Sequence, residues 1–251
     1  MIIDSRGRSR LDVNIMKNIV IIPTYNEITH IEKLLSEISC SYPELDILVV
    51  DDNSPDGTGR AAELFSGTHP RIKVLHRKIK TGLGGAYTEG FRYALSQNPP
   101  YERIIQMDAD FSHDPGYLKE LVSATKDKHI SIGSRYISGG RIADWKLSRR
   151  IFSYAANLFV HFWLRLKVRD CTSGFRCFRR EVLADLKPET LKSSGYFFQV
   201  EVLAHCLRCG YTFEEIPIVF IERKGGQTKL GFYEIWEAIC GVLILGFLMR
   251  K

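Results

Sequence analysis

The sequence lacks a hydrophobic run long enough to cross a bilayer. Residues 238–249 are uncharged, but this segment has only 12 residues, whereas a helix needs about 20 to span ~30 Å of hydrocarbon. Extending the segment back to Phe232 adds Glu234 and Glu237. We therefore expect residues 232–251 to form an amphipathic or re-entrant helix at a membrane surface rather than a transmembrane helix.

Residues 1–15 lack the apolar core of a signal peptide. They are polar and irregular, and we expect a disordered leader before a domain that begins at Met16. The six cysteines are then expected in the reducing cytosol. Cys206 and Cys209 have CxxC spacing, but the sequence has no second pair and no histidine spacing typical of zinc. Small buried helix residues are the favoured interpretation, and a metal or redox pair is the alternative.

The chain also lacks a strong charge excess of either sign. It has 35 Lys and Arg against 29 Asp and Glu, which gives a formal net charge of +6. This balance suits anionic ligands, a membrane surface or nucleic acid. Nucleic acid is the weakest of these, because the basic residues form separate clusters and no known binding module is recognisable. An obvious Ser-His or Cys-His pair for nucleophilic catalysis is missing too.

What the sequence does contain is an alternation of short apolar runs and helical patterns. We expect strands over residues 19–23, 46–50, 71–77, 103–107 and 212–221, and helices over 29–39, 59–65, 82–97, 149–166, 181–186 and 196–211. This alternation predicts an α/β domain with a mostly parallel sheet covered by helices on both faces. A chain of 251 residues without internal repeats accommodates this as one large domain.

Polar and acidic residues follow the first four predicted strands. They form the segments PTYNE (23–27), DDNSPDG (51–57), KTG (80–82) and DAD (108–110). Parallel α/β sheets bind ligands beyond the carboxyl ends of their strands. The four segments are therefore predicted to line one crevice.

Asp108 and Asp110 are the most informative pair in that crevice. They are two residues apart, so in extended backbone they point the same way. Like charges at a strand end are costly unless a cation lies beside them. Mg²⁺ or Mn²⁺ fits, because these ions take one or two protein carboxylates and fill their other positions with phosphate and water. Helix capping explains Asp114, which precedes Pro115, but not the two residues upstream.

Two further segments have competing interpretations. GLGGAYTEG (82–90) suggests a dinucleotide-binding loop, but Tyr87 stands where the fingerprint needs a third glycine, and the segment follows the third strand rather than the first. Residues 53–57 have plain turn chemistry. Asp51 and Asp52 directly follow an apolar run, and one of them could accept hydrogen bonds from a base or ribose.

Seven motifs then occur in one order: IPTYNE (22–27), VVDDNSPDGT (49–58), KTGLGGAY (80–87), MDADFSHDP (107–115), GSRY (133–136), TSGFR (172–176) and ERKGGQTKLG (222–231). Together they resemble the dolichyl- or polyprenyl-phosphate mannosyltransferases, inverting enzymes among the family-2 glycosyltransferases. The resemblance runs from Met16 to Gly231. The DAD motif alone is typical of any GT-A type glycosyltransferase, whereas DDNSPDGT and the R-x-x-G-x-[ST]-K-L ending are specific to the mannose branch. Thr228 replaces a usual serine, and Ser112 stands where some members carry glutamine.

This resemblance implies a GT-A fold that transfers mannose from GDP-mannose to polyprenyl (dolichyl) phosphate. It assigns the nucleotide sugar to Pro23, Tyr25, Glu27, Val50, Asp52, Asp108, Ala109 and Asp110. It assigns a metal, Mg²⁺ or Mn²⁺, to Asp108 and Asp110, with Asp110 as first choice. It assigns the lipid phosphate or diphosphate to Arg135, Arg149, Arg223 and Lys229, and catalysis to Asp108, Asp110 and Arg135. A phosphate acceptor needs no general base, because its second pKa is roughly 6.

Several alternatives stay open at this stage. A sister enzyme could use another donor, such as UDP-glucose, on the same lipid. A non-catalytic nucleotide-binding or scaffold protein is disfavoured because the site residues are intact. The sequence does not decide whether Arg149 or Arg150 points inward, or whether His113 binds a ligand or is structural. Glu201 is expected on a helix surface rather than in the site.

A lipid acceptor also needs an apolar surface. Residues 149–166 carry a broad helical stripe formed by Ile151, Phe152, Ala155, Leu158, Phe159, Phe162 and Trp163. This is either a core helix or an interfacial helix that faces acyl chains, and the implied substrate favours the latter. We expect a peripheral or monotopic protein at the cytoplasmic face of a membrane, with small membrane subunits as candidate partners.

Overall fold

The computed structural model describes residues 17–191, 193, 195, 197–221 and 232–249, with side chains described from Trp236 onward in the last segment. The strands are β1 (Asn18–Thr24), β2 (Asp46–Asp51), β3 (Ile72–His76), β4 (Arg103–Gln106), β5 (Ile130–Ser134), β6 (Arg141–Ile142), β7 (Arg176–Arg179), β8 (Phe213–Pro217) and β9 (Val219–Phe220). The helices are α1 (Ile31–Ser41), α2 (Thr58–Ser66), α3 (Gly82–Ser96), α4 (Leu118–Ala124), α5 (Leu147–Trp163), α6 (Arg180–Leu186), α7 (Phe197–Arg208) and α8 (Phe232–Met249), with single turns η1 (Pro115–Tyr117) and η2 (Pro188–Thr190).

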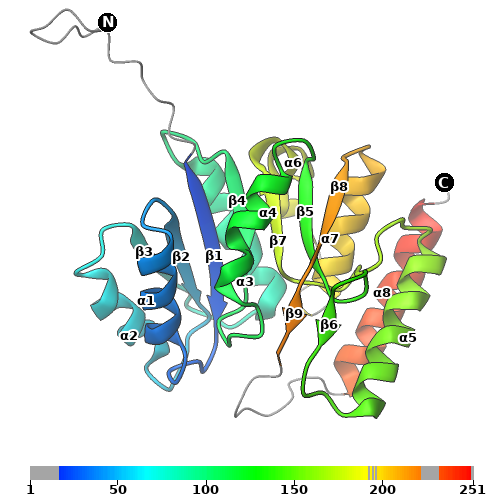
Figure 1. Cartoon of the computed structure of the whole chain (residues 1–251), viewed down its shortest axis with the longest axis horizontal. Coiled ribbons are helices and arrows are strands. Elements are labelled where there is room, and N and C mark those ends of the chain that lie inside the picture. Colours follow the sequence, from blue (N-terminus) through cyan, green and yellow to red (C-terminus); the bar gives the residue numbers. More distant parts are fainter. Residues whose placement is uncertain (1–16, 192, 194, 196, 222–231, 250–251) are drawn as a thin grey trace, which may run out of the picture.

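Seven strands form one twisted sheet in the order β3-β2-β1-β4-β7-β5-β8 (Figure 1). β1 pairs in parallel with β2 on one side and with β4 on the other. The chain first builds outward through β2 and β3 and then returns across β1 to form β4. This reversal makes a topological switch point between β1 and β4, which is where open α/β sheets bind ligands. The mostly parallel sheet is confirmed, with β7 running antiparallel between β4 and β5.

The core lies on both faces of the sheet, as the continuous apolar strands predict. In β1, Ile19 and Ile21 pack on the side of α3 and α7, whereas Val20 and Ile22 pack on the side of α1 and α4 (Figure 1). This follows from the alternation of side chains along a strand. All four are at most 1% exposed.

The glycine-rich segment serves helix packing. A β-carbon at Gly90 would come within 2.5 Å of Ile21 Cγ2, so glycine lets α3 lie directly on β1. Gly82, with φ of +85°, turns the chain into the helix in a conformation that favours glycine. The dinucleotide interpretation is therefore not needed to explain these residues.

The predicted strand over residues 212–221 is in fact two strands in different sheets. β8 extends the main sheet, and β9 pairs with β6 in a separate two-stranded sheet. β8 ends at Pro217, which has no N–H to donate to a further ladder. The single-strand prediction was wrong because periodicity does not reveal this change of partner.

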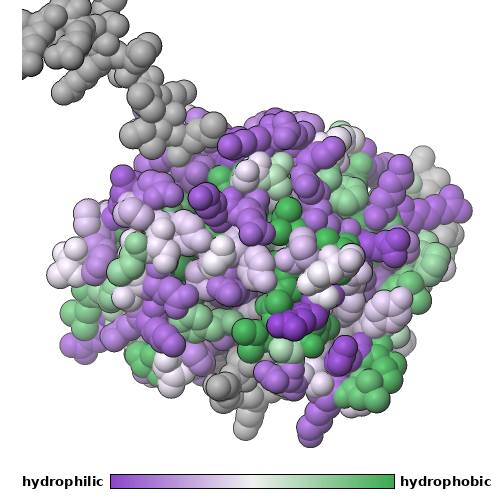
Figure 2. All heavy atoms as spheres, viewed as in Figure 1, coloured by the Kyte–Doolittle hydropathy of each residue, from purple (hydrophilic) through white to green (hydrophobic). Residues whose placement is uncertain are grey.

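α5 lies on the outside of the molecule, so the core-helix interpretation of residues 149–166 is wrong. Only Asn157 and Val160 are buried along α5, whereas Ile151 is 60% exposed and Phe162 is 68% exposed. α8 packs beside it, with Trp163 Nε1 3.5 Å from the Leu243 carbonyl oxygen (Figure 1). Part of the resulting apolar face is visible at the lower right of Figure 2. Within the described residues, no helix has the length and apolar character needed to cross a membrane.

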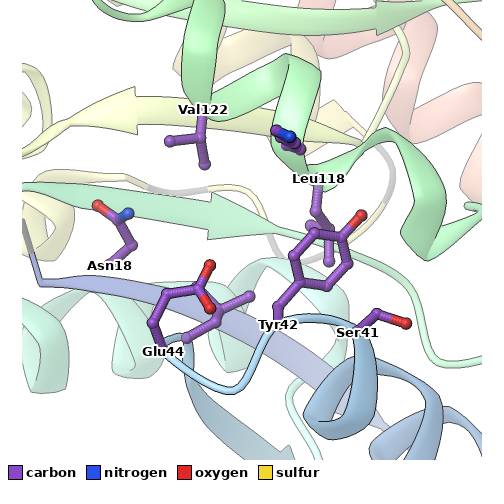
Figure 3. Close-up of a pocket in the computed structure, with 8 residues that line it drawn as sticks. Asn18, Ser41, Tyr42, Glu44, Leu118 and Val122 are labelled. Carbon is purple, nitrogen blue, oxygen red and sulfur yellow. The ribbon is translucent and has the colours of Figure 1, made fainter.

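A shallow pocket lies at the amino-terminal edge of the sheet, away from the predicted site. It has a volume of about 250 Å³, and the start of β1, the end of α1 and α4 surround it (Figure 3). Its labelled lining residues are Asn18, Ser41, Tyr42, Glu44, Leu118 and Val122. The predicted nucleotide-sugar residues in the loops after β1, β2 and β4 lie at the opposite ends of the strands.

Candidate active site

The four predicted loops meet at the carboxyl edge of the sheet. Thr24 pairs with Asp51, and Asp51 pairs with His76, so β1, β2 and β3 end side by side. On the other side of β1, the Met107 amide donates to the Ile21 carbonyl oxygen at 3.2 Å. The loops predicted from sequence to line one crevice therefore lie together around the switch point.

Asp51 builds the turn after β2. Its Oδ1 accepts hydrogen bonds from the hydroxyls of Thr24 (3.1 Å) and Ser54 (2.6 Å), and its Oδ2 accepts one from the Ser54 amide (3.1 Å). The residue is 4% exposed. Of the two adjacent aspartates, Asp51 thus has a structural explanation.

Asp52 connects the loops that follow β2 and β3. Its Oδ1 lies 2.5 Å from Nη1 of Arg77, and its Oδ2 accepts a hydrogen bond from the Gly82 amide at 3.1 Å. In this ion pair the side chain of Arg77 is 6% exposed and that of Asp52 is 5% exposed. Sequence reasoning missed Arg77, whose only signal was its position at the end of a strand. The role of Asp52 as a nucleotide ligand stays a prediction.

The first loop is fixed by contacts to the second and third. The Lys80 ammonium lies 3.5 Å from the centroid of the Tyr25 ring, a cation–π contact that joins the loops after β1 and β3. The Glu27 amide donates to the Thr58 hydroxyl at 2.9 Å, and Glu27 is 9% exposed. These contacts hold Tyr25 and Glu27 at the crevice.

Pro23 and Val50 lie opposite each other in β1 and β2. Val50 is fully buried in the core, on the side covered by α3. A contact from Val50 to a ligand would therefore have to come from its main chain.

Asp108 is held by two neighbours just beyond β4. Its amide donates to His113 Nδ1 at 3.0 Å, and its Oδ1 accepts a hydrogen bond from the Tyr87 hydroxyl at 3.4 Å. The side chain is 35% exposed. Burial of the carboxyl raises its pKa, the nearby charge of Asp110 raises it further, and His113 acts in the opposite direction. The charged form of Asp108 is thus destabilised in a way that a bound cation would relieve.

Asp110 completes the carboxylate pair. Its Oδ1 accepts a hydrogen bond from the Ser112 amide at 3.1 Å, which shapes the loop around it. Ala109 between the two aspartates is 3% exposed. Among the described residues, no three His, Cys, Asp or Glu side chains form a group that could hold a metal by themselves. Two partly exposed carboxylates fit a hard divalent cation that takes its other ligands from phosphate and water.

His113 supports the backbone of Asp108. Its ring is 2% exposed and stacks on Phe175, with centroids 4.8 Å apart. Burial lowers its pKa, which favours the neutral ring. Because Nδ1 accepts from the Asp108 amide, the proton of that neutral ring lies on Nε2. The structure favours the structural alternative for this histidine.

We expect the substitution His113→Phe to lower kcat/KM for transfer by about tenfold. Phenylalanine preserves the stacking on Phe175 but leaves the Asp108 amide without its acceptor, a loss of roughly 1–3 kcal/mol. His113→Asn is the matched control, because its Oδ1 can accept in place of Nδ1 and should restore most of the activity. Steady-state kinetics alongside thermal unfolding would test this. Equal losses in both variants would show that the hydrogen bond accepted from the Asp108 amide is not what His113 contributes to transfer.

Arg135 forms a buried bidentate ion pair with Asp170. Nε donates to Oδ2 and Nη2 donates to Oδ1, each at 2.7 Å, and Nη2 also donates to the Thr172 hydroxyl at 2.8 Å. The Arg135 side chain is 8% exposed and that of Asp170 is fully buried. Burial alone would raise the pKa of Asp170, but the charge and hydrogen bonds of Arg135 lower it overall. Sequence reasoning missed Asp170, although it lies two residues before the TSGFR motif.

Of the other cations predicted to bind phosphate, the structure describes only Arg149. The Arg149 guanidinium lies 4.1 Å from the centroid of the Trp145 ring and is half-buried, whereas Arg150 is exposed. Arg149 is thus the member of the pair that turns toward the protein. Arg223 and Lys229 lie outside the described residues.

The prediction that Glu201 is a surface charge was wrong. Glu201 is 8% exposed, and its Oε2 accepts a hydrogen bond from the Ser193 amide at 3.1 Å. Its partner Ser193 lies eight residues earlier, before α7 begins, and helical periodicity does not reveal this contact. Cys206 is buried in the core and Cys209 is exposed; both are free.

Comparison with known proteins places these motifs in a family. Residues 19–187 match the family described as Glycosyl transferase family 2. The undecaprenyl-phosphate mannosyltransferase of Micrococcus luteus is 40% identical over 235 residues, which cover 94% of this chain and 96% of that protein. The polyprenol monophosphomannose synthase of Mycolicibacterium smegmatis is 39% identical over 225 residues, covering 89% and 84%.

Solved structures share the fold at lower identity. A mannosyltransferase from Pyrobaculum calidifontis, solved with GDP-Man and Mn²⁺, has a TM-score of 0.60 at 20% identity and covers 94% of this chain, which spans 64% of that one. Glucosyl-3-phosphoglycerate synthase from Mycobacterium tuberculosis, solved with Mn²⁺, UDP-glucose and phosphoglyceric acid, has a TM-score of 0.63 at 16% identity, covering 92% and 80%. At these identities, the likeness establishes the fold alone.

Proposed function

This chain belongs to the polyprenyl-phosphate mannosyltransferases of glycosyl transferase family 2, and we propose that it transfers mannose from GDP-mannose to the phosphate of a polyprenyl phosphate. The observation that carries the proposal is the 40% identity to an undecaprenyl-phosphate mannosyltransferase over 94% of the chain. The polar loops that meet at the switch point of the sheet support it, because this is where such folds bind nucleotides. The products are polyprenyl phosphate mannose and GDP.

The donor would bind across the switch point. The first loop, with Tyr25 and Glu27, would hold guanosine together with the main chain at Val50. Asp52 would contribute through Oδ2, which accepts one hydrogen bond from Gly82. Ribose and diphosphate would lie at residues 108–110, where the two carboxylates meet the crevice.

Asp108 and Asp110 would hold a divalent cation, Mg²⁺ or Mn²⁺. When bound, such a cation neutralises the charge that develops on the departing GDP. The residues themselves prepare the position: Tyr87 and His113 orient Asp108, and the Ser112 amide orients Asp110. Asp110, the last residue of the DAD motif, would be the preferred ligand.

The acceptor phosphate needs cations rather than a base. Its second pKa is roughly 6, so it is largely ionised at neutral pH and can attack the anomeric carbon directly. A bond forms between a phosphate oxygen and that carbon as the bond to the GDP oxygen breaks, with inversion. Arg149 would hold the acceptor, with Arg223 and Lys229 as further predicted contacts. Arg135 would present Nη1, which is not used in its bonds to Asp170 and Thr172.

The apolar face of α5 and α8 would lie against the membrane that contains the polyprenyl chain. On α5 it exposes Ile151, Phe152 and Phe162, and on α8 it exposes Trp236, Ile244 and Phe247, each by more than half. Amphipathic surface helices bind bilayers by burying such side chains at the headgroup boundary. We place the protein at the cytoplasmic face, where small membrane subunits are candidate partners.

A transfer assay with two donors tests the proposal. Purified protein, a detergent-solubilised polyprenyl phosphate and Mg²⁺ or Mn²⁺ would receive GDP-mannose or UDP-glucose in parallel. We expect lipid-linked sugar from GDP-mannose at a rate at least 100-fold above that from UDP-glucose, because a site built for guanosine leaves polar groups unpaired with uridine. Transfer of glucose would support the assignment of the acceptor but overturn the assignment of the donor. Binding of GDP without transfer to any lipid would contradict the acceptor.

A further inference from the structure

A second cavity lies far from the crevice, where three helices end. It has a volume of about 530 Å³ and lies among the ends of α5, α7 and α8 and the start of β8. Lys128 and Thr212 line it, just before β5 and β8 begin. The cavity is therefore at the amino-terminal edge of the sheet, opposite the candidate active site. The ends of α5 and α8 and the start of β8 lie at the upper right of Figure 1.

The lining of this cavity is strongly basic. Four of its residues are cations, Lys128, Arg165, Lys167 and Arg208, and none is an aspartate or glutamate. The simplest explanation is that these cations stabilise the negative ends of the three helices. Each helix end carries only about half an elementary charge. Four cations therefore leave an excess of about 2.5 positive charges.

The backbone at Arg165 gives an independent indication. Arg165 follows the end of α5 with φ of +54°, a left-handed conformation that glycine or asparagine adopts more readily. Arg165 is exposed and lines the cavity, so its charge is accessible to an anion that binds there. The floor beneath it is apolar, since Leu164 and Leu166 are both 5% exposed.

The cavity also adjoins the proposed membrane face. Phe162, 68% exposed, lies one turn before Arg165. Nη1 of Arg208 donates to the carbonyl oxygen of Leu248 at 3.4 Å, and Leu248 and its neighbour Phe247 are 56% and 60% exposed. Cations thus border exposed apolar side chains on both helices, which is the arrangement of a surface that meets phosphate headgroups and acyl chains together.

We propose that this cavity binds the phosphate headgroup of an anionic membrane phospholipid. The inference rests on the proposed function, because it assumes that the face of α5 and α8 meets a bilayer. α5 has 17 residues, so it separates the cavity from the catalytic edge by about 25 Å at 1.5 Å per residue. A headgroup bound at one end of the face, and the acceptor phosphate at the other, would hold the enzyme flat on the membrane.

Flotation with lipid vesicles tests the proposal. The full chain would be mixed with vesicles of phosphatidylcholine alone or with 30 mol% phosphatidylglycerol. We expect tighter binding to the anionic vesicles, with the preference falling about 25-fold in the double variant Arg165→Asn/Lys167→Gln. This corresponds to about fivefold for each cation removed near an anionic surface. Asparagine suits the left-handed backbone at residue 165 and preserves the turn.

The chain offers a matched control in Lys187→Asn/Lys119→Gln. Lys187 also has a left-handed backbone after a helix, with φ of +51°, and neither lysine lines the cavity. This variant removes the same charge and should retain vesicle binding within about threefold. An equal loss in both variants would mean that net charge alone attracts the protein, and would overturn the proposal.

Two further measurements separate the remaining outcomes. Calorimetry with inorganic phosphate would reveal a free-phosphate site; saturable binding there without any preference for anionic vesicles would overturn the lipid assignment. Transfer to the detergent-solubilised acceptor should be unchanged in the cavity variant. Wild-type protein that transfers mannose in detergent but shows no anionic preference would refute this inference alone. A protein that binds anionic vesicles but transfers no mannose would refute the proposed function instead.

Discussion

Replacing Asp110 with asparagine is expected to reduce mannose transfer by about a thousandfold. The reaction must separate a sugar from a diphosphate that becomes more negative as it leaves. A cation held by Asp110 would supply several kcal/mol of charge stabilisation in the transition state, and about 4 kcal/mol corresponds to a thousandfold in rate. Asparagine has nearly the same shape and can still accept the Ser112 amide at Oδ1. The loss should therefore reflect charge and not the loop.

The measurement should include binding as well as turnover. Calorimetry should show that Mg²⁺ or Mn²⁺ strengthens GDP binding to the wild-type protein but not to the Asp110→Asn variant. Asp114→Asn is the matched control, because Asp114 lies in the same loop and caps η1 through the Gly116 amide at 2.7 Å, a role that asparagine performs equally well. Near-normal transfer by Asp110→Asn, or an equal loss in the control, would remove Asp110 from the metal site.

The sequence predicted the sheet and the polar loops at the ends of its strands because both follow from local patterns. The apolar runs around Ile21 and Val49 are buried on two faces, which is typical of parallel strands. The end of each apolar run then predicts where a strand ends, and acidic residues such as Asp108 directly follow these ends. Asp114 was also correctly identified as a cap, because capping depends on residues within one turn of chain.

What the sequence did not reveal is how distant side chains pair. Arg77 meets Asp52 across 25 positions, and Asp170 meets Arg135 across 35. No periodicity links such residues, and each alone resembles an ordinary surface charge. Glu201 was misjudged for the same reason, since its carboxylate accepts a hydrogen bond from the Ser193 amide, which lies before its helix begins. The loops of the site are thus predictable as a group, whereas the ion pairs that hold them are not.

The ion pair between Arg135 and Asp170 gives the second large expected effect. Substituting Asp170→Asn should destabilise the fold by about 3–5 kcal/mol, because it leaves a buried guanidinium without a counter-charge. Transfer should fall by at least 100-fold if Arg135 binds phosphate, since it loses the carboxylate that fixes its orientation. Chemical denaturation and steady-state kinetics would measure the two effects separately.

The difference in unfolding free energy between the wild-type protein and Asp170→Asn should decrease as the pH falls. Arg135 lowers the pKa of Asp170 in the folded protein, so the unfolded chain binds the proton more tightly. The stabilisation is therefore fully present above the unfolded pKa of about 3.9 and is lost as pH falls through the lowered folded pKa. Wild-type and Asp170→Asn proteins should differ most near neutral pH and converge in acid. A constant difference across this range would show that the charge of Asp170 is not the source.

A double variant separates the structural role of the pair from a role of Arg135 in transfer. In Arg135→Met/Asp170→Asn, neither charge of this ion pair remains, and asparagine Oδ1 can still accept the main-chain amide of residue 135, which donates to Asp170 at 3.0 Å in the native protein. Stability should recover by about 2 kcal/mol or more relative to Asp170→Asn. Transfer should stay at least 100-fold low if the guanidinium itself contacts phosphate. Recovery of both stability and transfer would instead show that Arg135 only supports the loop, and that Arg149, Arg223 and Lys229 bind the phosphates without it.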